Sequence, residues 1–137
     1  MSRTRPAAAS AAAVLLVGLA AGCSSAHGDP SAGSFRHGAC RSAAPAVLSA
    51  GEAARDAQSR DGARIGDLVA LTRAQRRLET VRRDATPAER RQLDRLVSAI
   101  GLYRLHAVGH TVSPAVARAV VTAQHGVVIR CVAQRTG

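Results

Sequence analysis

The chain has 137 residues, of which 47% are hydrophobic, and a formal net charge of +10. This length accommodates one domain, and all 19 basic residues are arginine. Basic chains often bind nucleic acid, but such proteins usually place aromatic side chains among the basic ones for stacking. Phe35 and Tyr103 are the only Phe, Tyr or Trp residues, so we expect no nucleic-acid partner.

The first 23 residues have the layout of an export signal. Arg3 and Arg5 precede the apolar run Ala7–Ala21, and Gly22 and Cys23 follow it. A transmembrane helix needs about 20 apolar residues, whereas this run has 15. A basic start, a short apolar region and small residues before a cleavage site are typical of a signal peptide.

Because small residues directly precede Cys23, the segment resembles a bacterial lipoprotein signal with its lipobox. The resemblance implies that residues 1–22 are removed and that Cys23 carries a diacylglyceryl group with fatty acids such as palmitate. It also implies anchoring at the extracytoplasmic face of the cell membrane. Ala20 stands where lipoboxes usually have leucine. An ordinary secretory signal and a retained transmembrane helix are the alternatives.

The remaining chain divides into a short linker and one domain. Residues 23–39 are rich in Ser, Gly and Pro, which predicts a flexible tether. Residues 40–137 then form the expected α-helical domain. Abundant Ala and the absence of Lys are typical of a GC-rich genome, and with the lipobox they resemble the small helical lipoproteins of actinobacteria.

Periodicity and capping signals predict three of the domain's helices. One covers about residues 65–81, another begins at the capping box Thr86-Pro87-Ala88-Glu89, and the last begins at Ser113-Pro114 and ends near Ala133. The residues that recur at helical spacing are Ile65, Leu68, Leu71, Thr72, Leu78 and Val81 in the first of these helices. In the next they are Leu93, Leu96, Val97, Ile100, Tyr103 and Ala107, and in the last Val116, Val120, Val127 and Cys131.

The two ends of the domain are less regular. The first helix, about residues 45–60, is mostly alanine on its inner face. It begins either at Pro45 or at the weaker box Ser49-Ala50-Gly51-Glu52. The β-branched run Val127-Val128-Ile129 makes a short strand over 127–132 the alternative to a helical end. We expect helix there, because no partner strand is visible.

Four helices with short turns predict a small all-α, antiparallel bundle. An even number of helices brings the start of the first and the end of the fourth to the same end, where Cys40 and Cys131 lie. An exported compartment permits disulfides, so we expect a Cys40–Cys131 bond, with two free thiols as the alternative. Closing a loop of about 90 residues contributes roughly 4–5 kcal/mol on the chain-entropy model.

The same topology brings the turn near Ala85 to this end of the bundle. The segments that meet there carry many arginines, and we expect them to form a membrane-facing platform on anionic headgroups. An ordinary solvated surface is the alternative. The platform residues are Arg36, Arg41, Arg82, Arg83, Arg90, Arg91, Arg130 and Arg135.

Histidines are the weak candidates for a metal site. His106 and His110 are four residues apart, a spacing at which a helix can chelate a metal. Two ligands are insufficient, and His125 on the facing helix lies too far along the bundle to join them. We therefore expect no metal and no cofactor. The chain also lacks a Gly-x-Ser-x-Gly elbow and a phosphate-binding loop, so no catalytic residue is assigned.

Exported chorismate mutases provide an enzyme alternative, because they are all-α, disulfide-linked and hold a dicarboxylate with arginine. Arg64, Arg76, Arg83 and Glu79 are the candidates, but the lysine that those enzymes generally use is absent and their motif spacing is not matched. We expect instead a non-catalytic binding or structural module at the cell envelope, with an apolar or basic groove between helices. Its expected partners are the bilayer, an anionic lipid or envelope polymer, and a protein.

Overall fold

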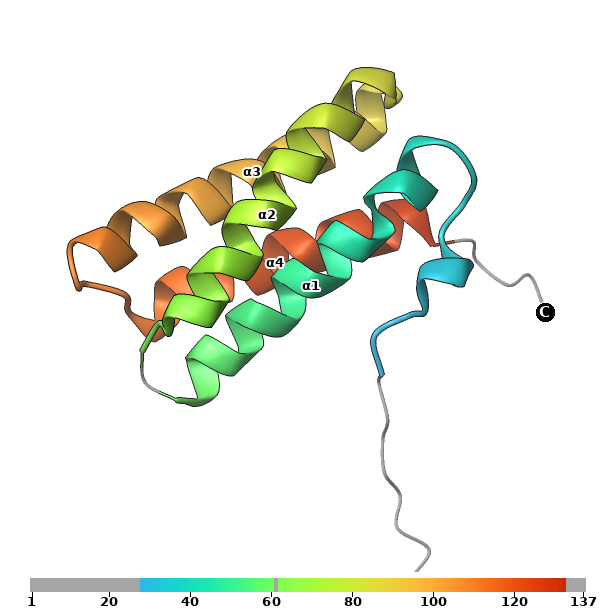
Figure 1. Cartoon of the computed structure of the whole chain (residues 1–137). Helices are drawn as coiled ribbons and strands as arrows, with labels where there is room; N and C mark the ends of the chain where they lie inside the picture. The colour runs from blue at the N-terminus through green and yellow to red at the C-terminus, as the bar shows by residue number, and fades with distance from the viewer. Residues whose placement is uncertain (1–27, 61, 133–137) are drawn as a thin grey trace, which may run out of the picture.

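The computed structural model describes residues 28–60 and 62–132, which fold as an antiparallel bundle of four α-helices (Figure 1). The all-α prediction is confirmed. Two short 3₁₀ turns are also present: η1 precedes the first helix, and η2 joins the second helix to the third. In chain order the elements are η1 (Ala32–Ser34), α1 (Ala39–Ser59), α2 (Ile65–Val81), η2 (Arg82–Asp84), α3 (Pro87–Val108) and α4 (Pro114–Cys131).

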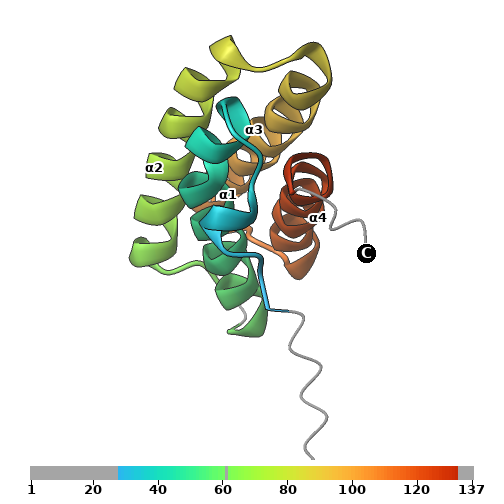
Figure 2. The same ribbon diagram turned by 90° about the vertical axis from the view of Figure 1, so that its right-hand side faces the viewer.

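Each helix packs against the next, and α4 closes the ring by packing against α1 (Figure 2). The interior is built from small residues on α1 and larger ones on the other three helices. Ala43, Ala50 and Ala54 of α1 are fully buried. Opposite them lie the buried side chains Leu71, Leu78, Leu93, Leu96, Ile100, Tyr103, Val120 and Val127.

Helix α1 differs most from the prediction, because it begins at Ala39 and not at Pro45 or Ser49. Pro45 lies inside the helix with its ring exposed. The earlier start places Cys40, Ala43 and Ala44 on the buried face. This burial outweighs the backbone hydrogen bond that an interior proline removes.

The later helices begin where their prolines predicted. In α3, Thr86 Oγ1 accepts a hydrogen bond from the Glu89 N–H at 3.4 Å, and the Glu89 carboxylate accepts one from the Thr86 N–H at 2.9 Å. Ser113 is the N-cap of α4, but its side chain makes no capping hydrogen bond. Helix α4 continues to Cys131, so the helical interpretation of residues 127–131 is confirmed, and only Val132 makes an isolated antiparallel bridge, to Phe35.

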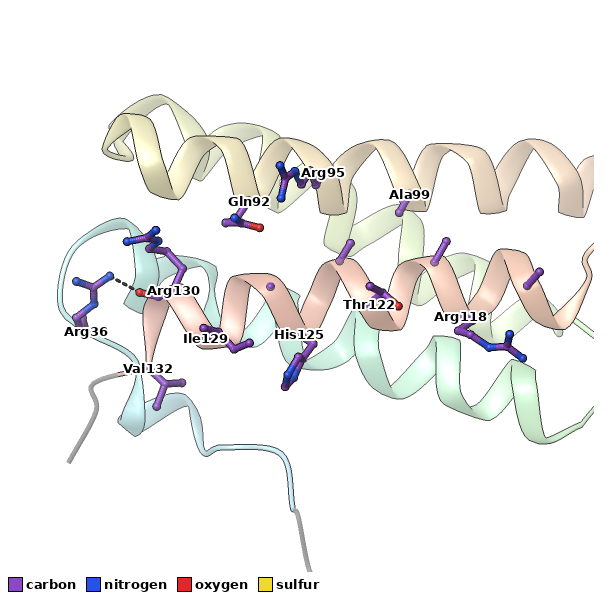
Figure 3. Close-up of a pocket in the computed structure, with 14 residues that line it drawn as sticks. Arg36, Gln92, Arg95, Ala99, Arg118, Thr122, His125, Ile129, Arg130 and Val132 are labelled. Carbon is purple, nitrogen blue, oxygen red and sulfur yellow. Dashed lines mark hydrogen bonds between the residues drawn. The ribbon is translucent and has the colours of Figure 1, made fainter. Parts of the chain in front are cut away.

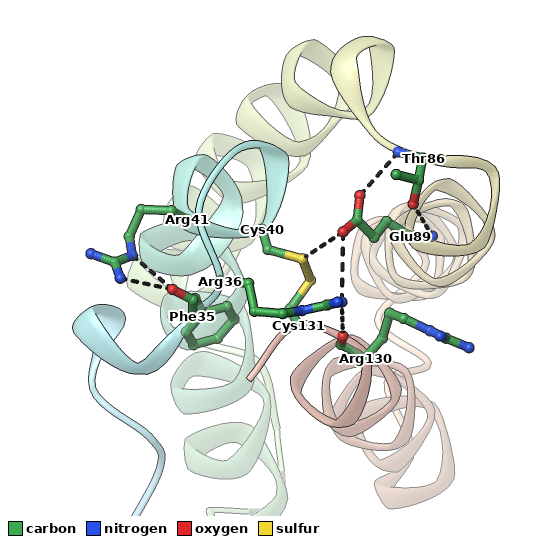
Figure 4. The surroundings of a disulfide bond; sticks show 8 residues. All are labelled: Phe35, Arg36, Cys40, Arg41, Thr86, Glu89, Arg130 and Cys131. Carbon is green, nitrogen blue, oxygen red and sulfur yellow. Dashed lines mark hydrogen bonds and ion pairs between the residues drawn. A yellow bond between two sulfur atoms is a disulfide. The ribbon is translucent and has the colours of Figure 1, made fainter. Parts of the chain in front are cut away.

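The expected disulfide is present and lies at the expected end of the bundle (Figure 4). Cys40 and Cys131 are bonded, with their Cα atoms 5.3 Å apart. Glu89, in the first turn of α3, places its Oε1 atom 3.3 Å from Cys40 Sγ. The starts of α1 and α3 therefore meet the end of α4 here, and we call this region the disulfide end.

The expected tether, residues 23–39, is ordered against the bundle in the part that the structure describes. Phe35 is only 1% exposed, and the Arg36 N–H donates to the Cys131 carbonyl at 2.8 Å. The Arg41 guanidinium donates to the Phe35 carbonyl at 2.8 and 3.0 Å. The burial of Phe35 attaches this segment, so the folded domain begins upstream of residue 40. Residues 1–27, including the expected signal segment and Cys23, lie outside the described residues.

Within residues 28–60 and 62–132, none of the helices combines the length and the apolar character needed to cross a bilayer.

Candidate functional site

A groove runs along the outer side of α4 and its junction with α3 (Figure 3). Its volume is about 1080 Å³. Its base is made of small residues, and its edges carry long basic side chains. We call it the α4 groove; its lining residues are Arg36, Gln92, Arg95, Ala99, Ala115, Arg118, Ala119, Thr122, Ala123, His125, Gly126, Ile129, Arg130 and Val132.

Small side chains at the base of the α4 groove give it its depth. Ala99 of α3 and Ala119 and Ala123 of α4 leave room between the two helices. At Gly126 an added Cβ atom would stand 2.8 Å from Gln92 Oε1, so the glycine admits the Gln92 side chain. Ile129 is 62% exposed and gives the groove an apolar residue between its basic edges.

The edges of the α4 groove are cationic, and no carboxylate lines it. The guanidinium of Arg36 lies 3.6 Å from Glu89 Oε1, and it also donates a hydrogen bond to the Arg130 carbonyl. Arg95, Arg118 and Arg130 have no ion-pair partner among the residues that the structure describes, and all three are exposed. The groove is therefore suited to a ligand that carries negative charge.

One feature of the sequence, the absence of acidic residues from its last third, relates to the charge of this groove. No Asp or Glu occurs after Asp94, although five arginines follow it. Helix α4 and most of α3 therefore contain no acidic residue with which these arginines could pair. The absence of acids over residues 95–137 therefore indicates unpaired arginines on α3 and α4. It does not define the groove itself, because Arg104 of the same stretch lies outside the groove lining and donates to Gln75 at 2.7 Å.

The described arginines of the expected platform belong to segments that meet at the disulfide end, but several are used within the fold, and Arg36 and Arg130 also line the α4 groove. Arg41 donates to main-chain carbonyls of residues 33 and 35, and Arg90 donates to those of residues 82, 83 and 85. Arg82 pairs with Asp94 at 2.8 Å. Within the described part of the chain, Arg83 and Arg91 remain exposed without an ion-pair partner. Arg135 lies outside the described residues.

The two candidate metal ligands do not share a helix. Helix α3 ends at Val108, and His110 follows in a turn with φ of 54°. His106 Nδ1 lies 3.1 Å from Thr111 Oγ1. Chelation of a metal by both histidines required the helix to continue through residue 110. The expected helical spacing of His106 and His110 is therefore wrong. In the described ranges, no group of three or more His, Cys, Asp or Glu residues could hold a metal ion.

The candidates for a chorismate-mutase-like site do not converge either. Arg64 is the N-cap of α2, and Arg83 lies beyond the other end of that helix. The 19 intervening steps correspond to about 28 Å along a helix axis. Glu79 accepts a hydrogen bond from Gln75 at 3.2 Å. Arg76 lines a shallow pocket on α2 with Ile65 and Val69, and Arg64, Arg83 and Glu79 do not line that pocket.

Two buried polar groups were not identified from the sequence. Tyr103 is fully buried, and its hydroxyl has no hydrogen-bond partner among the described residues. Burial raises the pKa of Tyr103 above its usual value, the charge of Asp67 raises it further, and Arg60 partly opposes the rise. Gln124 Nε2, buried beside Gly51, also lacks a partner in the described part. Neither group lines the α4 groove.

No protein-family model, no curated protein and no solved structure matches the chain.

Proposed function

We propose that this chain is an exported lipoprotein, anchored through acylated Cys23 at the extracytoplasmic face of the cell membrane. Its helical domain is a non-catalytic binding module that holds an anionic ligand of the envelope in the α4 groove.

The unpaired charge of the α4 groove carries this proposal. Arg95, Arg118 and Arg130 are exposed, and no carboxylate lines the groove beside them. Isolated cations on an apolar base attract and orient an anionic ligand, and each good charge-assisted hydrogen bond adds specificity. No residue of the groove is needed as an acid, base or nucleophile for this activity.

The cysteines support the exported state. Cys40 and Cys131 are bonded, and structural disulfides are typical of exported proteins and rare in the cytosol. Cys23 is the third cysteine of the chain, so pairing of the other two leaves it available for acylation. The small apolar run before it supplies the export signal described above.

Metabolic labelling tests the anchor. Cells that express the full chain are grown with an alkyne analogue of palmitate, and the membrane fraction is examined for a labelled protein. We expect label on the wild-type chain and none on Cys23→Ser, which should leave the membrane fraction. Label on both variants, or an intact signal segment on the mature product, would contradict the proposed anchor.

Photo-crosslinking in intact cells tests the groove. A photoreactive amino acid replaces Thr122, which lines the α4 groove, or Thr80, which is exposed on α2. We expect an adduct of defined mass from position 122 and none from position 80. Adding Arg118→Gln should reduce the yield at position 122. Equal yields from both positions would argue against a binding role for the groove.

A further inference from the structure

The chain enters the bundle from its side. Asp29 forms an ion pair with Arg55 of α1, and the following residues run back to the disulfide end, where Phe35 bridges to Val132. Arg55 is 15 residues along α1 from Cys40, a distance of about 22 Å along the helix. Figure 2 shows this segment passing beside α1 on the side of α4.

The length of chain before this point restricts the pose of an anchored domain. Cys23 is five residues before Gly28, and five residues reach at most about 18 Å even when fully extended. If the disulfide end rested on the bilayer, the ion pair with Arg55 would hold Asp29 well above the membrane, and the five residues from Cys23 would have to be almost fully extended to span that height. With the bundle on its side, the same residues reach the bilayer without full extension.

The surface next to this entry point suits an anionic bilayer. Arg95, Arg118, His125 and Arg130 occupy the edges of the α4 groove and Ile129 stands exposed among them. Basic residues around an exposed apolar side chain are typical of segments that bind the interface of anionic membranes. At the disulfide end, Arg41, Arg82 and Arg90 make contacts within the protein, and among the described residues Arg83 and Arg91 remain exposed without an ion-pair partner.

We infer that the domain docks side-on, through the outer face of α4 and the α4 groove, on the anionic phospholipid headgroups beside its own anchor. This inference rests on the proposed anchor at Cys23 and names the ligand of the groove as phospholipid. Arg95, Arg118 and Arg130 contact headgroup phosphates, and Ile129 enters the headgroup layer. The acyl chains on Cys23 and the basic face together supply the two signals that stable membrane association requires.

Vesicle binding tests the docking face without the anchor. The exported form, residues 23–137 with Cys23→Ser, contains every residue of the described core, which lies between Ala32 and Val132. It is titrated with vesicles of equal parts phosphatidylglycerol and phosphatidylcholine, and with phosphatidylcholine alone. Two variants of equal charge are compared, Arg95→Gln with Arg118→Gln on the α4 groove, and Arg83→Gln with Arg91→Gln at the disulfide end.

We expect binding to the anionic vesicles only, with about 25-fold weaker binding for the groove pair, since each arginine near such a surface contributes about fivefold. The disulfide-end pair should lose less than about threefold through long-range attraction. Equal or greater loss in the disulfide-end pair would overturn side-on docking. Equal binding to neutral vesicles would overturn the anionic headgroup as the ligand.

Environment-sensitive labels give an independent measure of the pose. A fluorophore is attached to a cysteine introduced at Thr122 on α4, at Pro87 at the disulfide end or at Thr80 on α2, all of which are exposed. We expect a blue shift with anionic vesicles at position 122 alone. A shift at position 87 alone would instead establish end-on docking.

These experiments separate the two proposals because they use the unlipidated chain. Failure of palmitate labelling with normal vesicle binding would remove the anchor and keep the docking face. Normal labelling without vesicle binding would remove the docking face and keep the anchor. In that second case, a crosslink at Thr122 to a protein or glycan would identify a different ligand for the groove.

Discussion

Residues 28–94 contain 12 arginines and all nine carboxylates, whereas residues 95–137 contain five arginines and no carboxylate. In the first region, ion pairs join Arg55 to Asp29, Arg60 to Asp56 and Asp67, and Arg82 to Asp94. In the described part of the second region, Arg95, Arg118 and Arg130 remain exposed along α4 and α3. Every ion pair among the described residues therefore lies in the first region, although Arg83 and Arg91 are unpaired there. In the second region Arg104 donates to Gln75 at 2.7 Å, and Arg95, Arg118 and Arg130 remain available to a partner.

The disulfide joins the two regions, and its removal should have the largest effect. Cys40 and Cys131 are 91 residues apart in the sequence. In the double variant Cys40→Ser with Cys131→Ser, we expect the free energy of unfolding to fall by about 4–5 kcal/mol, because the unfolded chain gains the entropy of an open loop. Urea unfolding followed by circular dichroism measures the change.

Reductant provides the control for this prediction. Wild-type protein in excess dithiothreitol should unfold at the same urea concentration as the double variant, and the double variant should be insensitive to dithiothreitol. If reduction leaves the wild-type midpoint unchanged, the two regions are held together by packing alone.

A close contact between α1 and α4 should give the next largest effect. A Cβ atom at Gly51 would stand 2.8 Å from Gln124 Cδ, whereas one at Gly101 would meet nothing closer than Gln75 Nε2 at 3.8 Å. We expect Gly51→Ala to destabilise the fold by about 1–3 kcal/mol through overpacking. Gly101→Ala, also within a helix, should stabilise it by up to about 1 kcal/mol. Thermal unfolding of both variants measures the contrast, and equal shifts would contradict the close contact.

The uneven success of the sequence analysis has a physical origin in these same helices. In α2, α3 and α4, large apolar residues at helical spacing and the prolines at positions 87 and 114 identified each element. In α1, alanine gives little contrast between the inner and outer faces, and Pro45 suggests a false start. Phe35 is buried beside residues far away in the sequence, and Gly51 contacts Gln124 of another helix. The pattern of neighbouring residues therefore could not predict either feature.

Tyr103 provides a test of the buried interior. Its hydroxyl is buried without a partner among the described residues, and such a group costs about 1–3 kcal/mol. We expect Tyr103→Phe to stabilise the protein at pH 7 by about 1 kcal/mol, as measured by urea unfolding.

The pH dependence gives a second test of Tyr103. Burial raises its pKa in the folded state, so the unfolded chain ionises first, near pH 10. The wild-type free energy of unfolding should be unaffected by this group below pH 10 and should fall as the pH rises from there through the folded-state pKa. Tyr103→Phe should lack this part of the fall. Parallel pH profiles for the two proteins would show that the hydroxyl is solvated.

The smallest effect should distinguish the two regions most directly, because it applies one substitution to both. Arg82 pairs with Asp94 at 2.8 Å, with both side chains nearly half exposed. Arg82→Gln should therefore cost about 0.2–1 kcal/mol at low salt, and the cost should diminish in 0.5 M NaCl as screening increases. Arg118 has no such partner in the described structure, so Arg118→Gln should leave stability within about 0.5 kcal/mol of wild type.

Paired urea titrations at two salt concentrations measure this difference, and the vesicle assay should rank the same variants in the opposite order. Arg118→Gln weakens binding with little change in stability, and Arg82→Gln lowers stability with little change in binding. A measurable loss of stability in Arg118→Gln would mean that this arginine has a role within the fold. The absence of acids after Asp94 would then no longer indicate a surface reserved for an anionic partner, since an arginine can also stabilise a fold by packing its methylene groups.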